Sequence, residues 1–207
     1  MKTFLEFVRL WLLAFVMCAA GVALSFALID VPVAMHFWRI GHFLHHLNTA
    51  FGASVILTLE SAVAIGLVLA RVLRGHLSRG AEALAIACVA SICTYGINSE
   101  VLKPLFGVPT PSDVVEGARH AFNFMMGSAE SSFPSGHMTL AGAFAGVFMR
   151  LHRASFWPFT ALLALAACML IVGGWHFVSD VVAGTFIGVS AGILAGEVWT
   201  VHTGYTN

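Results

Sequence analysis

Six long apolar stretches constrain this chain more than any other feature, because each is close to the roughly 20 residues that cross a bilayer as a helix. They lie at residues 8–29, 51–73, 81–102, 136–152, 156–174 and 178–200. Hydrophobic residues make up 59% of the 207 and charged residues 10%, and the mean hydropathy is +0.90. These values predict an all-α, polytopic membrane protein, with six transmembrane helices in a bundle that forms one domain over residues 1–207.

The segment between the first two spans has a different composition. It contains Trp38, Arg39 and three histidines, His42, His45 and His46. Aromatic and weakly basic side chains suit the headgroup layer, so we expect an interfacial helix after the first span. The three histidines share one helix face and could in principle bind a metal. Interfacial segments commonly use such residues without a metal, and we expect neither a metal nor a cofactor.

The positively charged residues predict the orientation of the chain, because cytoplasmic loops carry the excess of Lys and Arg. Seven of them fall in segments that alternate with the spans on one side: Lys2, Arg9, Arg71, Arg74, Arg79, Arg150 and Arg153. The opposite side has only Arg39, Lys103 and Arg119, and it holds the long connection 103–136. We expect this second side to be extracytoplasmic, in a bacterial inner membrane. A net charge of zero gives no sign of a nucleic-acid partner.

Two histidine segments border this connection and the last span. Ser135 and Gly136 precede His137, and Gly174-Trp175-His176-Phe177-Val178-Ser179-Asp180 opens the last span. A histidine four residues before an aspartate on one helix face can be oriented and made nucleophilic by it. A second histidine beside a Ser-Gly turn can supply a proton, and the turn can supply anion-binding amides. Together these segments indicate phosphoryl chemistry at a membrane surface.

With Lys103-Pro104-Leu105-Phe106-Gly107, the two histidine segments resemble the three signature motifs of the type 2 phosphatidic acid phosphatase superfamily. The resemblance covers residues 103–184. The six-helix layout and the extracytoplasmic site are also similar to the membrane-bound lipid phosphatases of that group. The resemblance implies a metal-independent enzyme that removes phosphate from a lipid or isoprenoid phosphate.

It also implies a role for each matching residue. His176 would take the phosphoryl group as a phosphohistidine, with Asp180 holding its other ring nitrogen. His137 would protonate the leaving oxygen and later activate water. The non-bridging phosphate oxygens would be bound by Lys103, the Ser135 hydroxyl and the Gly136 amide. Such a site agrees with phosphoryl transfer, which depends mainly on positioning and charge stabilisation.

Two positions depart from the family pattern. Thr110-Pro111 stands where the first motif has Arg-Pro, and Met169-Leu170 stands where the third has Ser-Arg. A guanidinium binds phosphate with two parallel hydrogen bonds that threonine or leucine cannot replace. Since losing one transition-state donor costs about a hundredfold in rate, an efficient monoesterase would need a compensating group.

Three interpretations follow. In the first, the chain is a lipid phosphatase in which Thr110, Arg119 or His120 contributes to phosphate binding. In the second, a less cationic pocket accepts a phosphodiester, and the enzyme transfers a headgroup between lipids. In the third, catalysis is lost and a lipid-binding membrane protein remains. An active enzyme is favoured because five motif residues occur together, namely Lys103, Ser135, His137, His176 and Asp180. The phosphatase comes first because it is the broader class.

Glycines recur every four residues in two of the spans. They are Gly142 and Gly146 in the fourth span, and Gly184, Gly188, Gly192 and Gly196 in the sixth. Such faces allow close helix contacts, either within the chain or in a homodimer. Asp180 and Gly184 share one of these faces, so tight packing there would fix the position of the carboxylate.

Overall fold

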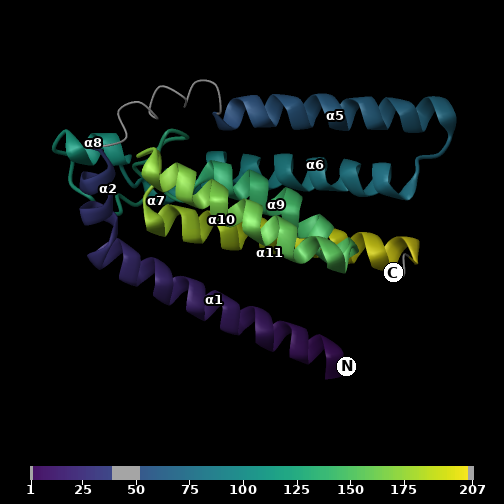
Figure 1. The fold of residues 1–207 in the computed structure, drawn as a ribbon, viewed down its shortest axis with the longest axis horizontal. Helices are drawn as coiled ribbons and strands as arrows, with labels where there is room; N and C mark the ends of the chain where they lie inside the picture. The colour runs from purple at the N-terminus through teal and green to yellow at the C-terminus, as the bar shows by residue number, and fades with distance from the viewer. Residues whose placement is uncertain (1, 39–51, 205–207) are drawn as a thin grey trace.

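The computed structural model describes residues 2–38 and 52–204, and these ranges contain helices and loops but no strand. Six long helices correspond to the six predicted spans and confirm the all-α fold. They are α1 (Lys2–Leu28), α5 (Ala53–Arg74), α6 (Arg79–Ile97), α9 (Gly136–Leu151), α10 (Phe156–Val172) and α11 (Val178–Thr203). Figure 1 shows α6, α9, α10 and α11 running along one another, with α1 and α5 on the two outer sides.

The helices differ in how well they match the thickness of a membrane. Among the described residues, five helical segments are long and apolar enough to cross a bilayer. The exception is α9, whose 16 residues span about 24 Å. That is shorter than a hydrocarbon core of roughly 30 Å. Most of α9 is buried, and it packs most extensively on α11 and α6, so it forms the centre of the bundle.

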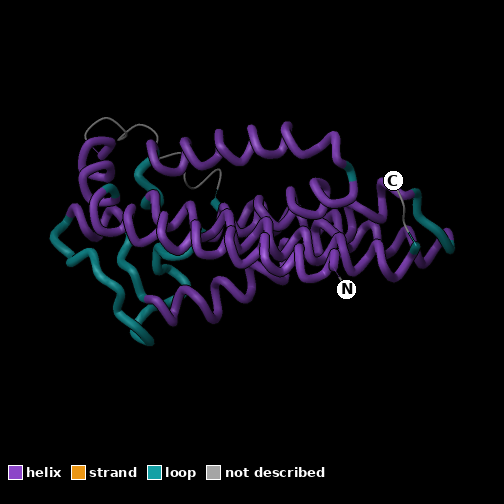
Figure 2. The backbone as a smooth tube through the Cα atoms, turned by 90° about the horizontal axis from the view of Figure 1, so that it is seen from below, coloured by secondary structure: helices purple, strands orange, loops and turns teal. Residues whose placement is uncertain are grey.

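Short helices and loops gather at one end of the bundle (Figure 2). α2 (Asp30–Trp38) follows α1 directly and agrees with the expected helix after the first span. Arg39, His42, His45 and His46 lie outside the described residues. At the same end, α7 (Lys103–Phe106) and α8 (Pro111–Val115) precede the long loop to α9. A π-helical turn, η1 (Asn98–Leu102), joins α6 to α7; such turns are frequent at functional sites.

The charged ends of the long helices lie at the other end of the bundle. Figure 1 places the N-terminus, the α5–α6 turn and the end of α11 away from α2, α7 and α8. Arg71 and Arg74 belong to the last turn of α5, and Arg150 belongs to the last turn of α9. Arg71, Arg74 and Arg150 are thus separated along the bundle from the two histidine motifs, as the predicted orientation requires. Which side of a membrane each end faces stays a prediction.

The glycines of α9 and α11 face each other and bring the two backbones into contact. A Cβ atom added at Gly192 would lie 2.1 Å from the Ala143 carbonyl oxygen. One added at Gly188 would lie 2.5 Å from the Thr139 oxygen. The predicted close approach of glycine faces is therefore confirmed within the chain. A homodimer, which the sequence also allowed, would have to use other surfaces.

This contact predicts an effect of replacing Gly192 with alanine. The added methyl group meets backbone atoms that cannot move separately, and overpacking of this kind costs about 1–3 kcal/mol. We expect Gly192→Ala to lower the melting temperature of the protein in detergent. Gly66 on α5 is the matched control, because nothing lies within 4 Å of its added Cβ. An equal melting temperature for Gly192→Ala and Gly66→Ala would show that the backbones are not in contact.

Candidate active site

Asp180 lies in the first turn of α11, and its carboxylate is fully buried. One oxygen, Oδ2, accepts hydrogen bonds from the Phe177 amide at 2.8 Å and from the Ser132 hydroxyl. The same oxygen lies 3.4 Å from Nδ1 of His176. The carboxylate is therefore held by three parts of the chain, which are the helix start, the loop before α9 and the histidine.

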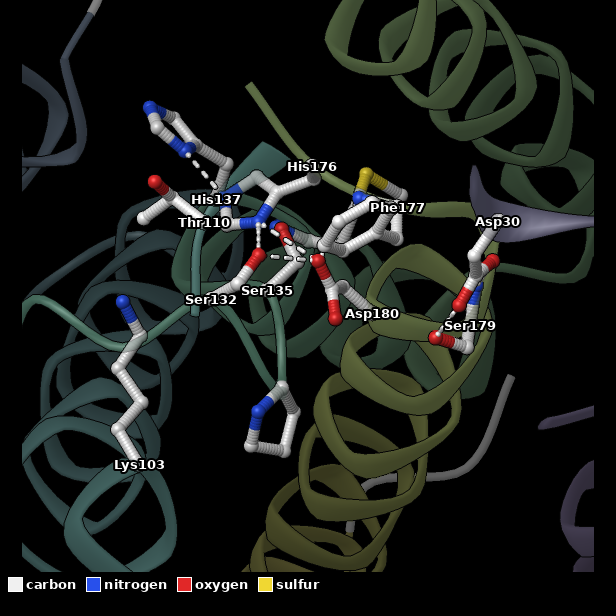
Figure 3. A network of polar contacts seen from close by, with 12 residues as sticks. Asp30, Lys103, Thr110, Ser132, Ser135, His137, His176, Phe177, Ser179 and Asp180 are labelled. Atoms are coloured by element: carbon white, nitrogen blue, oxygen red, sulfur yellow. Dashed lines mark hydrogen bonds and ion pairs between the residues drawn. The ribbon is translucent and has the colours of Figure 1, made fainter. Parts of the chain in front are cut away.

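His176 lies in the short connection between α10 and α11. Gly174 has a φ of +68°, which lets the chain turn sharply before the histidine. The His176 side chain is 8% exposed. Its Nδ1 faces Asp180, and its Nε2 lies 3.4 Å from Nδ1 of His137 (Figure 3). A carboxylate on Nδ1 favours the tautomer with its proton there, which leaves the Nε2 lone pair toward His137.

The start of α9 contributes the second histidine and the Ser-Gly turn. The Ser135 hydroxyl accepts a hydrogen bond from the Met138 amide at 3.3 Å, so Ser135 is the N-cap of α9. Gly136 is required sterically, because its Cβ would lie 2.9 Å from the Tyr95 ring. The first amides of α9 have no partners within the helix, and this end of a helix favours anions. His137 follows within the same turn.

In Figure 3 the ammonium group of Lys103 points toward the side of the network that holds Thr110, Ser132 and the histidines. It is 9% exposed, and its Nζ donates a hydrogen bond to the Ala129 carbonyl oxygen at 3.1 Å. The π-helical turn before it holds Asn98, whose Nδ2 donates to the Pro134 oxygen at 3.2 Å. The turn therefore connects the lysine to the loop that carries the Ser-Gly-His segment.

Thr110 and Leu170 stand at the two positions where the family pattern has arginine, and each makes contacts of another kind. Thr110 caps α8 reciprocally with Asp113, and its hydroxyl is also within hydrogen-bond distance of Ser112. Leu170 is 5% exposed and packs with Met138 and Val181 in an apolar cluster. An arginine at position 170 would have to enter that cluster, whereas Thr110 lies outside it.

The sequence suggested that Arg119 or His120 supplies the missing positive charge. Arg119 is exposed and makes no hydrogen bond or ion pair within residues 2–38 and 52–204. His120 is stacked on Phe26, with 4.1 Å between ring centroids, and its Nε2 lies 3.6 Å from Oδ2 of Asp30. The hypothesis that His120 replaces a phosphate-binding arginine is therefore not supported, because its ring nitrogen faces a carboxylate. A phosphate-binding role for Arg119 stays a prediction.

Asp30 and His120 form a second buried pair of a carboxylate and an imidazole. Asp30 is 1% exposed, and both its oxygens accept hydrogen bonds from Ser179, one from the amide at 3.0 Å and one from the hydroxyl. Burial raises the pKa of the Asp30 carboxyl, although the bonds from Ser179 oppose the shift. Burial lowers the pKa of the His120 imidazole, and the Asp30 charge opposes that shift.

Sequence reasoning missed several of these contacts. Ser132 lies three residues before Ser135, and only its nearness to the motif could have drawn attention to it. Asp30 belongs to the segment after the first span, whose composition predicts only an interfacial helix, and Asn98 carries no sequence signal. Among the described residues, no group of three or more His, Cys, Asp or Glu side chains is placed to hold a metal ion.

The fold and site together define a membrane-embedded protein with two facing histidines and a buried aspartate, built on α9 and α11. Residues 83–202 match the family model of the PAP2 superfamily, which is more than half of the chain. The chain therefore belongs to the PAP2 superfamily, as the motifs predicted.

Two relatives carry the same name. A lipid A 1-phosphatase of Rhizobium etli is 31% identical over 180 residues, which cover 81% of this chain and 76% of the relative. A lipid A 1-phosphatase of Rhizobium johnstonii is 29% identical over 192 residues, covering 86% and 77%. A PAP2-type phosphatidylglycerolphosphate phosphatase of Bacillus subtilis has a similar fold, with a TM-score of 0.54 and 17% identity over 95% of this chain and 96% of that one.

The contact between Ser132 and Asp180 predicts the effect of Ser132→Ala. Losing a hydrogen bond to a charged group costs about 1.5–3 kcal/mol, which corresponds to roughly a tenfold to hundredfold loss of rate if the bond orients the pair during turnover. We expect this loss in kcat with an unchanged folded state in detergent. Ser131→Ala is the matched control, because the Ser131 hydroxyl accepts a bond from Ser128 rather than donating to Asp180. Equal kcat values for the two variants would show that the Ser132 hydroxyl does not contribute to turnover.

Proposed function

We propose that this protein is a membrane lipid phosphatase that acts through a phosphohistidine on His176. The observation that carries the proposal is the environment of one imidazole. His176 has Asp180 at Nδ1 and His137 at Nε2, each at 3.4 Å. The carboxylate orients the ring, so the nitrogen toward the second histidine is the nucleophile.

The proposed reaction has two steps. First, the Nε2 lone pair of His176 attacks phosphorus while the bond from phosphorus to the lipid oxygen breaks, and that oxygen takes a proton from His137. Second, water attacks the phosphohistidine, His137 takes a proton from the water, and the bond from phosphorus to nitrogen breaks. Inorganic phosphate leaves and both histidines return to their starting forms.

The phosphate oxygens would be bound by few positive charges. Lys103 supplies one ammonium group, and the first amides of α9, starting at Gly136, supply neutral donors. The Ser135 hydroxyl is engaged in capping α9, yet it can still donate its own proton to a phosphate oxygen. The Thr110 hydroxyl, which is bonded to Asp113 in this structure, is a further candidate.

The names of the relatives and the apolar helices support a choice of substrates to test. Two relatives at about 30% identity are named lipid A 1-phosphatases, so a glycolipid that carries phosphate on its sugar is the first substrate to test. Phosphatidate, phosphatidylglycerol phosphate and an isoprenoid diphosphate complete the panel. We place the reaction at the extracytoplasmic membrane face, because the positive loops lie at the other end of the bundle.

The test is phosphate release from this panel by purified protein in the presence of a chelator. We expect release by the wild type, and a loss of about a thousandfold or more in His176→Ala and His137→Ala. His202→Ala is the matched control, since His202 is exposed in the last turn of α11, at the opposite end of the helix. Release that is equally fast in His176→Ala would contradict the proposal.

The same samples distinguish the other interpretations. New phosphodiester lipids without free phosphate would indicate headgroup transfer, for which a less cationic pocket is suited. Neither product from any lipid would indicate a binding protein. Thr110→Arg further distinguishes a lipid phosphatase from a headgroup transferase, because an added guanidinium at the phosphate site favours a dianionic monoester over a diester.

A further inference from the structure

The residue at the N-cap of α11 makes no capping hydrogen bond with its side chain. Phe177 occupies the N-cap position, where its ring cannot accept a hydrogen bond from the first amides. Two carboxylates accept these bonds instead. Asp180 accepts from the Phe177 amide at 2.8 Å, and Asp30 accepts from the Ser179 amide at 3.0 Å. The second of these carboxylates comes from a different helix, α2.

The contact between Asp30 and Ser179 joins residues 149 positions apart in the sequence. Asp30 is 1% exposed and Ser179 is fully buried. Both Asp30 oxygens are used, one by the Ser179 amide and one by its hydroxyl, so the carboxylate holds this residue in a single position. Solvent screens such a buried contact little, and an anion at a helix N-terminus is favoured by the helix dipole.

The surroundings of Asp30 repeat those of Asp180. Each carboxylate accepts from a serine hydroxyl and from a backbone amide of the first turn of α11, and each lies within 4 Å of an imidazole nitrogen. For Asp30 the imidazole is His120, whose ring also packs on Phe177 with 4.4 Å between centroids. The Asp30–His120 pair and the Asp180–His176 pair therefore both contact the same turn of backbone, residues 177–180.

We propose that Asp30 is a positioning residue for the Asp180–His176 pair. Ser179 is covalently joined to Asp180, so a carboxylate that fixes the Ser179 backbone also fixes where the Asp180 side chain begins. His120 supports the same turn through its contact with Phe177, the residue after His176. Displacements of about 1 Å at a reacting group can cost a hundredfold in rate. The inference rests on the proposed function, because it gives Asp30 a role in positioning His176, the nucleophile of the proposed reaction.

Asp30→Asn tests this role with little change of shape. The amide keeps one acceptor oxygen, but it loses the charge and one of the two bonds from Ser179. We expect kcat to fall about tenfold with KM changed less than about twofold, because positioning acts on the chemical step rather than on lipid binding. Ser179→Ala, which removes only the hydroxyl bond, should have a smaller effect in the same direction.

Glu197→Gln is the matched control. Glu197 also belongs to α11, and it forms an ion pair with Arg150 toward the other end of that helix. If Asp30 served only the stability of the helix, the two variants would share the same kinetics. A double-mutant cycle adds a sharper readout: in an Asp180→Asn background, Asp30→Asn should cause little further loss, because the group through which it acts is already removed. Additive losses would overturn the proposal.

A second readout does not depend on turnover. Diethyl pyrocarbonate modifies neutral imidazole, and peptide mass spectrometry reports its rate at His176 alone. The His176 side chain is 8% exposed, and the reagent reaches a ring that is held less firmly more often, so we expect Asp30→Asn to raise this rate by about threefold, as Asp180→Asn does, while Glu197→Gln does not. If the wild type releases no phosphate, the proposed function fails, and this rate still decides the role of Asp30. An unchanged rate in Asp30→Asn would overturn that role.

Discussion

The contact between the start of α9 and the start of α11 is the constraint on which the site depends. The Ser135 amide donates to the Asp180 carbonyl oxygen at 3.1 Å, and a Cβ added at Gly184 would lie 2.5 Å from the Ser135 carbonyl oxygen. Glycines farther along both helices continue this contact. His137 and His176, which are 39 positions apart in the sequence, meet because these two backbones touch.

The start of α11 also holds two carboxylates close together, Asp30 and Asp180. Mutual repulsion would separate them if the field of the helix and the donors around them did not favour both. Each has a serine hydroxyl, an amide and an imidazole nearby. The arrangement connects the first helices of the chain and the long loop to the residues that we propose for catalysis. In this way elements outside the three motifs contribute to the geometry of the histidine pair.

The sequence predicted the parts of the structure that local patterns determine. Hydropathy located the six long helices of the described residues, and the spacing of His176 and Asp180 predicted that the imidazole and the carboxylate lie together. The expected single helix face was wrong, because α11 begins at Val178 and His176 lies in the connection before it. Ser132 and Asp30 were missed because their roles arise from contacts across 48 and 149 positions, which no local period reports. His120 was one of the residues considered for phosphate binding, because the sequence of a loop near a motif gives no sign of which side chain a histidine will contact. The contact of His120 with Asp30 depends on how the loop between α8 and α9 packs against α1 and α2.

The central claim is that the phosphoryl group passes through one nitrogen of His176. It is tested most directly by brief reaction of purified protein with a lipid substrate labelled in its phosphate, followed by peptide mass spectrometry under alkaline conditions that preserve phosphohistidine. We predict label on His176 in the wild type and none on that peptide in Asp180→Asn at equal times, since the unoriented ring reacts more slowly. Label on His137, or phosphate release with no labelled histidine at any time, would contradict the claim.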